Sequence, residues 1–337
     1  MASPRIALDV MGGDHAPRAT LEGALRACDP ASERPLEPSR VVLVGDEAAI
    51  RAGLAELGGD PGFVVQHASQ AIGMAEAPAT ALRAKPDSSI AVGVGLVKQG
   101  AAGAVVSMGN TGAVVGAATL VLGTLEGVKR PAIAVTLELS GHPVTLLDMG
   151  ANIASKPQHL AQNALMGAVY QRDCLGTADP RVALLNIGTE PSKGTDLLKD
   201  AYPLLEAAPV RFVGNIEGTD IFRAAADVVV TDGFTGNVVL KLLESFAGFM
   251  MDLVLKELRA HEVQWAPEAL QHINRKIDYA EYGGALLLGV RGIVLKGHGR
   301  SDAGAVANAL VQAARALDAR VNEHIVSGLA ASGPAPA

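Results

Sequence analysis

Glycine-rich loops that carry Asp, Asn, His, Thr or Lys follow several short apolar runs of this chain. The loops cover residues 11–17, 109–112, 149–152, 187–194 and 232–237. Glycine allows the backbone to approach a ligand closely, and a helix that starts after such a loop adds positive potential. Loops of this type are suited to binding phosphate or another oxyanion.

Each loop taken alone has an ordinary alternative, which is a β–α turn in which Asn or Asp caps the next helix. Open α/β sheets bind ligands beyond the carboxyl ends of their strands. The recurrence of such loops after apolar runs therefore favours one shared ligand site over a set of unrelated turns.

Several familiar catalytic motifs are missing from the sequence. The chain has no P-loop, no G-x-G-x-x-G fingerprint, no G-x-S-x-G elbow and no H-E-x-x-H. Their absence counts against a P-loop NTPase, a standard dinucleotide enzyme, an α/β-hydrolase and a zinc protease. Cys28 and Cys174 are far apart and form no metal-ligand pattern. We therefore expect no cofactor and no metal ion.

The spacing of apolar residues predicts alternating strands and helices. Runs rich in Val, Ile and Leu predict strands at residues 6–10, 41–44, 63–65, 90–94, 104–108, 133–137, 144–147, 182–187, 212–213, 228–231 and 293–295. Ala/Leu-rich segments with helical spacing lie at 19–27, 160–170 and 305–317. The alternation predicts a three-layer αβα fold with a doubly wound, largely parallel sheet.

The composition is that of a globular protein with an acidic balance. Hydrophobic residues make up 49% of the 337 residues and charged residues 19%, which allows a large core. The net charge of -7 counts against nucleic-acid binding, because that needs a basic surface. Glycines and polar residues break the uncharged stretch 99–125, which counts against a membrane span. Free thiols and the lack of a signal-peptide pattern predict a cytoplasmic protein.

We expect one catalytic α/β unit over residues 1–326, built as two intertwined lobes, because no low-complexity linker divides the chain. Residues 327–337, which end in Gly-Pro-Ala-Pro-Ala, are expected to form a mobile tail. Apolar residues at helical spacing predict a long amphipathic helix over residues 238–259. This helix is a candidate for the contact surface of a dimer.

The loops and their flanking residues resemble the motifs of the phosphate acyltransferase (PlsX) family of bacterial phospholipid synthesis. The first match is Leu8-Asp-Val-Met-Gly-Gly-Asp-His-Ala-Pro17, and the others lie in family order at residues 107–113, 147–152, 184–188 with 193–194, 214–218, 232–238 and 278–284. The resemblance implies an enzyme that moves a long-chain fatty acyl group from acyl carrier protein to inorganic phosphate, giving an acyl phosphate.

The resemblance also implies a homodimer and a fold similar to the isocitrate dehydrogenase and phosphotransacetylase group. A membrane-bound glycerol-3-phosphate acyltransferase would then use the acyl phosphate. The competing functions are a phosphotransacetylase-like enzyme that uses a small acyl-coenzyme A, a decarboxylating dehydrogenase of similar fold and a non-catalytic sensor of small anions. The acyl donor and the formation of acyl phosphate discriminate among them.

In the implied reaction phosphate is itself the nucleophile, so the protein needs to hold phosphate and to stabilise an oxyanion. We expect Lys193 to supply a cation for phosphate and Asn237 to donate its amide to phosphate or to the oxyanion. Asp232 is expected to orient Lys193 or Asn237 rather than to act as a base, since phosphate is already negatively charged. The ordinary alternatives are a solvated surface lysine at 193 and a helix cap at 237.

The other polar and glycine residues of the loops are predicted to bind phosphate or the pantetheine arm of the donor. They are Gly12, Gly13, Asp14, His15, Asn110, Thr111, Gly112, Asn152 and His298. Capping and packing are the alternatives for Asp14 and His15, tight-turn structure for the threonine and the asparagines, and a structural role for His298.

A basic patch is predicted to receive the acidic acyl carrier protein, with a solvated helix face as the alternative. Its residues are Lys256, Arg259, Arg275 and Lys276. Val263, Trp265 and Leu270 form a modest apolar edge within this stretch, which predicts weak and reversible contact with the inner face of the plasma membrane.

The chain departs from the family pattern at Thr231, Leu286 and Arg300, where the family often has cysteine, proline and serine. The change to arginine at 300 has the most bearing on an anionic substrate, because it adds a positive charge beside a glycine-rich segment.

Overall fold

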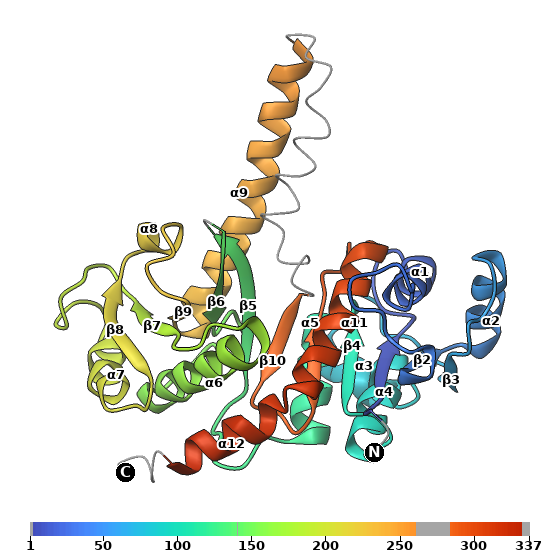
Figure 1. Ribbon diagram of the computed structural model, residues 1–337, viewed down its shortest axis with the longest axis horizontal. Coiled ribbons are helices and arrows are strands. Elements are labelled where there is room, and N and C mark those ends of the chain that lie inside the picture. The colour runs from blue at the N-terminus through green and yellow to red at the C-terminus, as the bar shows by residue number, and fades with distance from the viewer. Residues whose placement is uncertain (1–2, 140, 261–283, 332–337) are drawn as a thin grey trace. The chain divides into compact units, whose positions relative to one another are not determined.

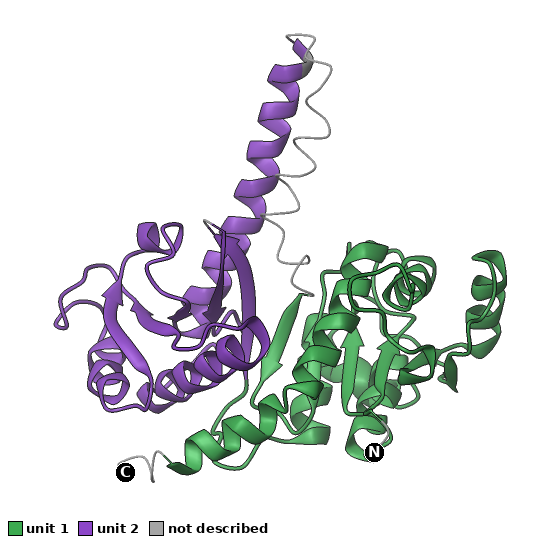
Figure 2. Ribbon diagram, viewed as in Figure 1, with its two compact units in different colours: residues 1–131, 282–337 green, residues 132–281 purple. Residues whose placement is uncertain are grey.

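The computed structural model describes residues 3–139, 141–260 and 284–331 of the chain (Figure 1). The chain divides into two compact units, which are coloured separately in Figure 2. Unit 1 comprises Met1–Pro131 and Tyr282–Ala337, and unit 2 comprises Ala132–Glu281. The first and the last described residues therefore belong to unit 1 (Figure 2).

Unit 1 contains the strands in the order β3-β2-β1-β4-β11-β10, of which only β10 is antiparallel to its neighbour β11. The strands are β1 Ile6–Asp9, β2 Val41–Gly45, β3 Val64–His67, β4 Ala104–Ser107, β10 Ala285–Leu288 and β11 Ile293–Lys296. Every residue of β1, β2 and β4 is buried, as expected for strands covered on both faces.

The helices of unit 1 lie on both sides of its strands. They are α1 Arg18–Ala27, α2 Glu47–Glu56, α3 Pro78–Ala84, α4 Ser89–Lys98, α5 Thr111–Ala117, α11 Ala303–Asp318 and α12 Val321–Ala331, with a 3-10 turn at Pro38–Arg40 and a π-helical turn at Ala118–Leu122. The strand order reverses after β3, so right-handed crossovers place α4 on the face opposite to α1 and α2. The α11 helix packs on α1. This doubly wound arrangement confirms the predicted fold class.

Unit 2 has the strand order β5-β6-β9-β7-β8, in which β5 and β6 form an antiparallel hairpin and the others are parallel. The strands are β5 Ala132–Leu139, β6 His142–Leu147, β7 Arg181–Leu185, β8 Arg211–Ile216 and β9 Val228–Val230. The helices are α6 Pro157–Leu175, α7 Asp196–Glu206, α8 Gly218–Ile221 and α9 Gly233–Ala260.

The prediction of a strand over residues 90–94 is wrong, because this segment lies in α4. Ser88 caps the helix by accepting a hydrogen bond from the Ala91 N–H at 3.4 Å. Gly93 lets the helix approach the sheet, since a Cβ atom there would lie 3.1 Å from Val105 Cγ2. Val and Ile are frequent in strands, but here the cap and the sheet contact override that preference.

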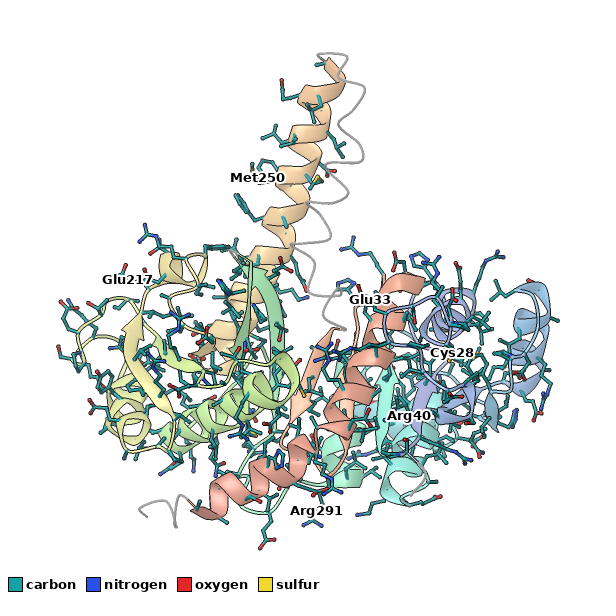
Figure 3. All side chains as sticks on the ribbon, in the orientation of Figure 1. Cys28, Glu33, Arg40, Glu217, Met250 and Arg291 are labelled. Atoms are coloured by element: carbon teal, nitrogen blue, oxygen red, sulfur yellow. The ribbon has the colours of Figure 1, made fainter. Side chains whose placement is uncertain are left out.

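Two further boundaries differ from those inferred from the sequence. Helix α9 starts at Gly233 rather than at residue 238, and α12 continues to Ala331, so the first residues of the expected tail are helical. The α9 helix extends beyond the strands of unit 2, and its side chains around Met250 project from it (Figure 3). Among the described residues, no helix has the length and apolarity needed to cross a bilayer.

A partly buried ion pair at the start of β7 predicts a pH-dependent contribution to stability. Asp227 accepts hydrogen bonds from Arg181 Nε at 3.1 Å and Nη2 at 2.9 Å. Burial raises the pKa of Asp227, but the hydrogen bonds and charge of Arg181 outweigh burial and hold it below the ordinary value of 3.8. The stability that this shift provides is therefore present above that pH and is lost as the pH falls through the folded-state pKa.

Replacing Arg181 by Met is expected to lower the free energy of unfolding by about 2 kcal/mol at neutral pH, because Asp227 stays buried with less compensation. The loss should shrink near pH 3, where the carboxyl is protonated in the unfolded chain. Urea denaturation at neutral pH and near pH 3 measures this loss of stability. The control is Arg211→Met, because Arg211 and Asp179 pair at 3.1 Å on the surface and this pair should contribute under about 1 kcal/mol.

Candidate functional site

Three loops of unit 1 meet at the carboxyl ends of adjacent parallel strands, and we call them the unit 1 loops. They are residues 11–17 after β1, 108–112 after β4 and 297–301 after β11. The Asp14 N–H donates to Gly299 O at 2.7 Å, and the Gly297 N–H donates to Ser107 O at 3.1 Å. The strand order thus brings together segments that are distant in the sequence.

Gly12 and Gly13 allow the first of these loops to lie directly on the second. A Cβ atom at Gly12 would clash with Asp9 Oδ2 and would lie 2.8 Å from Gly109 N. Gly13 has a φ of 102°, a conformation that side chains other than glycine rarely adopt. The structure thus gives these glycines a role in the contact between the loops, and the approach to a ligand that the sequence predicts for them stays a prediction.

Asp14 and His15 are exposed on the first loop, and α1 begins after them without a side-chain cap. The capping alternative for these residues is therefore not what the structure shows. His298, in the third loop, accepts a hydrogen bond at Nδ1 from the Arg300 N–H at 3.2 Å. Arg300 itself is exposed.

Asn110 is buried and acts as the cap of α5. Its Oδ1 accepts from the Ala113 N–H at 3.1 Å, and its Nδ2 donates to Met74 O and Glu76 O, each at 3.0 Å. These bonds occupy the amide in the observed geometry, which supports a structural role for this side chain. Thr111 and Gly112 follow it as exposed residues of the first helical turn.

Unit 2 has a second set of loops, which we call the unit 2 loops: residues 148–152 after β6, 186–195 after β7 and 231–237 after β9. Asp148 is fully buried and organises the first loop. Its Oδ1 accepts from the N–H groups of Gly150 at 3.1 Å and Ala151 at 2.8 Å, and its Oδ2 accepts from Asn152 Nδ2 at 2.8 Å. Asn152 is thereby held by the loop.

Asn237 lies within the early part of α9, which excludes the helix-cap alternative. The cap is Asp232, whose Oδ1 accepts from the N–H groups of Phe234 and Thr235, each at 3.0 Å. Asn237 is exposed and lies over the first unit 2 loop, since a Cβ atom at Gly150 would be 3.2 Å from Asn237 Oδ1. Asp232 therefore caps the helix that carries Asn237.

Lys193 has a fixed backbone and a loosely held ammonium group. Asn186 Nδ2 donates to Lys193 O at 3.1 Å, and the Lys193 N–H donates to Glu190 O at 3.1 Å. The Nζ atom is 4.0 Å from Glu190 Oε1, and 49% of the lysine side chain is exposed. Its loop follows β7, which pairs with β9. Asn152 lies on the loop after β6, and Asn237 lies in the first turns of α9, which begins after β9.

Sequence reasoning missed Asp9, Asp148 and Asn186, the polar side chains that hold these loops in place. All three lie within the family motifs, each as the residue that ends or follows a strand and precedes a loop that contains glycine. That position was the available signal.

The predicted carrier-protein patch is only partly described. Lys256 is an exposed residue of α9, and Arg259 belongs to the same helix. Arg275 and Lys276 lie outside the described residues, as do Val263, Trp265 and Leu270.

Gly236 provides a local test of the contact between α9 and the first unit 2 loop. A Cβ atom at this position would clash with Asp148 O and lie 3.1 Å from Thr231 Cγ2. Gly236→Ala is therefore expected to lower the free energy of unfolding by about 3 kcal/mol and to displace the first unit 2 loop.

The matched control is Gly248→Ala in the same helix, where a Cβ atom would meet nothing within 4 Å. It should raise the free energy of unfolding by up to about 1 kcal/mol, because alanine favours helix. Urea denaturation of both variants provides the comparison, and equal effects would contradict the assigned contact.

Comparisons with known proteins agree on one family. A family described as "Fatty acid synthesis protein" matches residues 4–324. A phosphate acyltransferase from Heliobacterium modesticaldum is 46% identical over 332 residues, covering 95% of this chain and 97% of the relative. One from Desulfitobacterium hafniense is 44% identical over 328 residues, covering 95% and 96%.

Solved structures show the same fold at low identity. A phosphotransacetylase from Streptococcus pyogenes has a TM-score of 0.63 and 18% identity, covering 94% of each chain. A branched-chain phosphotransacylase from Enterococcus faecalis has a TM-score of 0.58 and 16% identity, covering 93% of this chain and 99% of its own. The motifs, the doubly wound fold and the full-length relatives together show that this chain is an acyltransferase and belongs to the phosphate acyltransferase family.

Proposed function

We propose that this enzyme transfers a long-chain fatty acyl group from acyl carrier protein to inorganic phosphate and so supplies acyl phosphate for phospholipid synthesis. The observation that carries the proposal is the 46% identity, over 95% of the chain, to a protein named phosphate acyltransferase. The exposed ammonium of Lys193 on a fixed loop supports it, because the acceptor is an anion.

The proposed chemistry is a direct displacement at the thioester carbonyl. A phosphate oxygen supplies the electron pair that forms the new C–O bond, the C–S bond then breaks, and the thiol of the carrier's pantetheine leaves as a thiolate. Lys193 holds phosphate by charge, and the Asn237 amide donates to the oxyanion that forms on the carbonyl oxygen. Asp232 keeps Asn237 in place by capping α9.

We further propose that the N–H groups and polar side chains of the unit 1 loops, including Asp14, His15 and Thr111, bind phosphate or pantetheine. The glycine-rich backbone of these loops supports this role, since it leaves few side chains in the way of a ligand. Lys256 and Arg259 on α9, with Arg275 and Lys276, are proposed to receive the acidic carrier protein.

The proposed homodimer is supported by the exposed apolar residues of α9. Val238, Leu242, Phe246 and Leu253 recur at helical spacing with exposed fractions of 53%, 66%, 57% and 42%. A stripe of this kind is typical of a helix that packs against a partner. We propose a cytoplasmic protein with weak membrane contact, which would bring acyl phosphate to a membrane-bound glycerol-3-phosphate acyltransferase.

The test is phosphate-dependent release of free carrier protein from palmitoyl-acyl carrier protein, with the acyl phosphate trapped by hydroxylamine as its hydroxamate. Release together with trapped product is the expected result. Turnover with acetyl-coenzyme A alone would favour a phosphotransacetylase-like enzyme. Saturable phosphate binding without any hydroxamate from either donor would overturn the proposal in favour of an anion sensor.

A further inference from the structure

Asn215, near the end of β8, has a buried amide that contacts the loop of Lys193. Only 5% of this residue is exposed, and its Nδ2 donates to Glu190 O at 2.9 Å. The Lys193 N–H donates to the same oxygen at 3.1 Å. One carbonyl group therefore joins the Asn215 side chain to the backbone of the residue that is proposed to hold phosphate.

A β-bulge in β8 decides on which face of the sheet Asn215 lies. Val182 of β7 pairs with Phe212 of β8. The next pair joins Leu184 to Asn215, so that one residue of β7 lies opposite two residues of β8. The second of these two is Gly214, whose φ of 93° is one that other residues rarely adopt. An extra residue reverses the face on which the following side chains lie.

The backbone of Lys193 is held on both sides. Its N–H donates to Glu190 O, and its carbonyl oxygen accepts from Asn186 Nδ2 at 3.1 Å. The stem of the lysine lies over Gly188, where a Cβ atom would be 3.1 Å from Lys193 Cγ. The point from which the ammonium group extends is therefore set by this backbone, and one of its two supports depends on Asn215.

The Asn215 side chain makes only part of the hydrogen bonds that an amide can make. Among the residues that the structure describes, none hydrogen-bonds to its buried Oδ1. A buried oxygen without a donor lowers stability. Gln171, another buried amide of unit 2, differs, because its Nε2 donates to Pro143 O at 2.8 Å and its Oε1 accepts from Thr177 Oγ1 at 3.0 Å. The contribution of Asn215 is therefore its single bond to Glu190 O.

We propose that Asn215 is a positioning residue for acyl transfer: through Glu190 O it holds the Lys193 backbone where the ammonium group reaches phosphate. The inference rests on the proposed function for the role of Lys193. The hydrogen bond from Asn215 is a property of the fold and can be tested without turnover.

The first experiment compares amide hydrogen exchange in the wild type and Asn215→Ala by mass spectrometry, without substrates. Residues 188–195 should exchange about threefold to tenfold faster in the variant, the range that the loss of one hydrogen bond implies. The loop at residues 148–152, which Asp148 holds, should exchange as in the wild type. Equal exchange at 188–195 in both proteins, or a general increase throughout unit 2, overturns the inference.

The second experiment measures the KM for phosphate and kcat by hydroxamate formation from palmitoyl-acyl carrier protein. Asn215→Ala should raise this KM by about tenfold, because the ammonium group is no longer held in place for the anion. Asn215→Asp keeps the size of the side chain but removes the donor, so it should be at least as impaired as Asn215→Ala. An unchanged KM in both variants contradicts the positioning role.

The Lys193→Ala background distinguishes positioning from a general loss of structure. If Asn215 acts through Lys193, then Asn215→Ala should change kcat/KM by under about twofold once the lysine is absent. Independent effects would instead multiply, and that result rules out the positioning role. If the wild type forms no hydroxamate but the exchange result holds, then only the proposed function fails.

Gly214→Ala disturbs the bulge without removing the amide. A Cβ atom there would meet nothing closer than Tyr202 Oη at 3.5 Å, so the substitution acts through the backbone conformation. It should raise the KM for phosphate, as Asn215→Ala does. The matched control is Gly176→Ala, at the end of α6, where φ is 83° and a Cβ atom would meet nothing within 4 Å.

This control imposes similar backbone strain far along the chain from the unit 2 loops, before β7 begins. Its melting temperature should fall much as that of Gly214→Ala does, while its KM for phosphate stays within about twofold of the wild type. Equal KM values in the two glycine variants contradict the assigned role of the bulge and of Asn215. If Asn215→Ala does not fold, this comparison decides the outcome.

Discussion

Replacing Lys193 by Ala is expected to lower kcat/KM for acyl transfer to phosphate by about 100-fold to 1000-fold. The residue supplies an exposed ammonium from a loop whose backbone is held by Asn186. The Lys193 Nζ atom lies 4.0 Å from Glu190 Oε1, so the ammonium group is able to turn toward an anion. The loss should appear in both KM for phosphate and kcat, since the cation opposes charge in the bound and transition states. Hydroxamate formation over a range of phosphate concentrations measures both.

Lys199→Ala is the matched control for this variant. Lys199 is an exposed lysine of α7 in the same unit, 3.8 Å from Asp196 Oδ1, so its removal changes the net charge equally. We expect this control to remain within about twofold of the wild type, because exposed ion pairs contribute little. Lys193→Arg should recover part of the activity, since it keeps the charge but not the geometry. Full activity in Lys193→Ala, with an unchanged melting curve, would remove Lys193 from the mechanism.

The fold could be predicted from the sequence where local pattern and burial agree. The runs at residues 6–10, 41–44 and 104–108 became fully buried parallel strands, because continuous apolar runs suit a sheet covered on both faces. The run at 90–94 became a helix, because the Ser88 cap and the contact of Gly93 with the sheet decide its conformation. The Ser88 cap is a local signal that the sequence does contain, whereas the contact of Gly93 with Val105 exists only in the fold.

The candidate site could be predicted in outline from the sequence, but the side chains that hold its loops in place could not. The glycine and amide residues of the loops follow from motif and spacing. Asp148 is important because the Ile133 N–H of β5 and the N–H groups of its own loop converge on it, and this convergence exists only in the fold. In the same way, Asp232 was identified by its motif, but its role as the cap of α9 required knowing that the helix starts at Gly233.

Asn237→Ala is expected to lower kcat by about 100-fold to 1000-fold with a smaller change in KM, because an oxyanion donor acts mainly in the transition state. The residue is exposed, so its truncation leaves no buried group unpaired and should cost under about 1 kcal/mol of stability. The Asn237→Ala variant therefore tests catalysis separately from folding. Gly236→Ala, at the neighbouring position, does not, because it is expected to lower stability as well. The kinetics of hydroxamate formation and a urea denaturation curve measure the two effects.

Asn237→Asp makes the assignment specific, because it keeps the size of the side chain but replaces the amide donor with a negative charge. If the amide donates to phosphate or to an oxyanion, this variant should be at least as impaired as Asn237→Ala, since the new charge repels both anions. Ser245→Ala, at another exposed position of α9, is the control and should keep wild-type kinetics. Should Asn237→Asp instead retain most of the activity, the side chain accepts rather than donates in the reaction, and the oxyanion donor must be sought among the backbone N–H groups of the unit 2 loops.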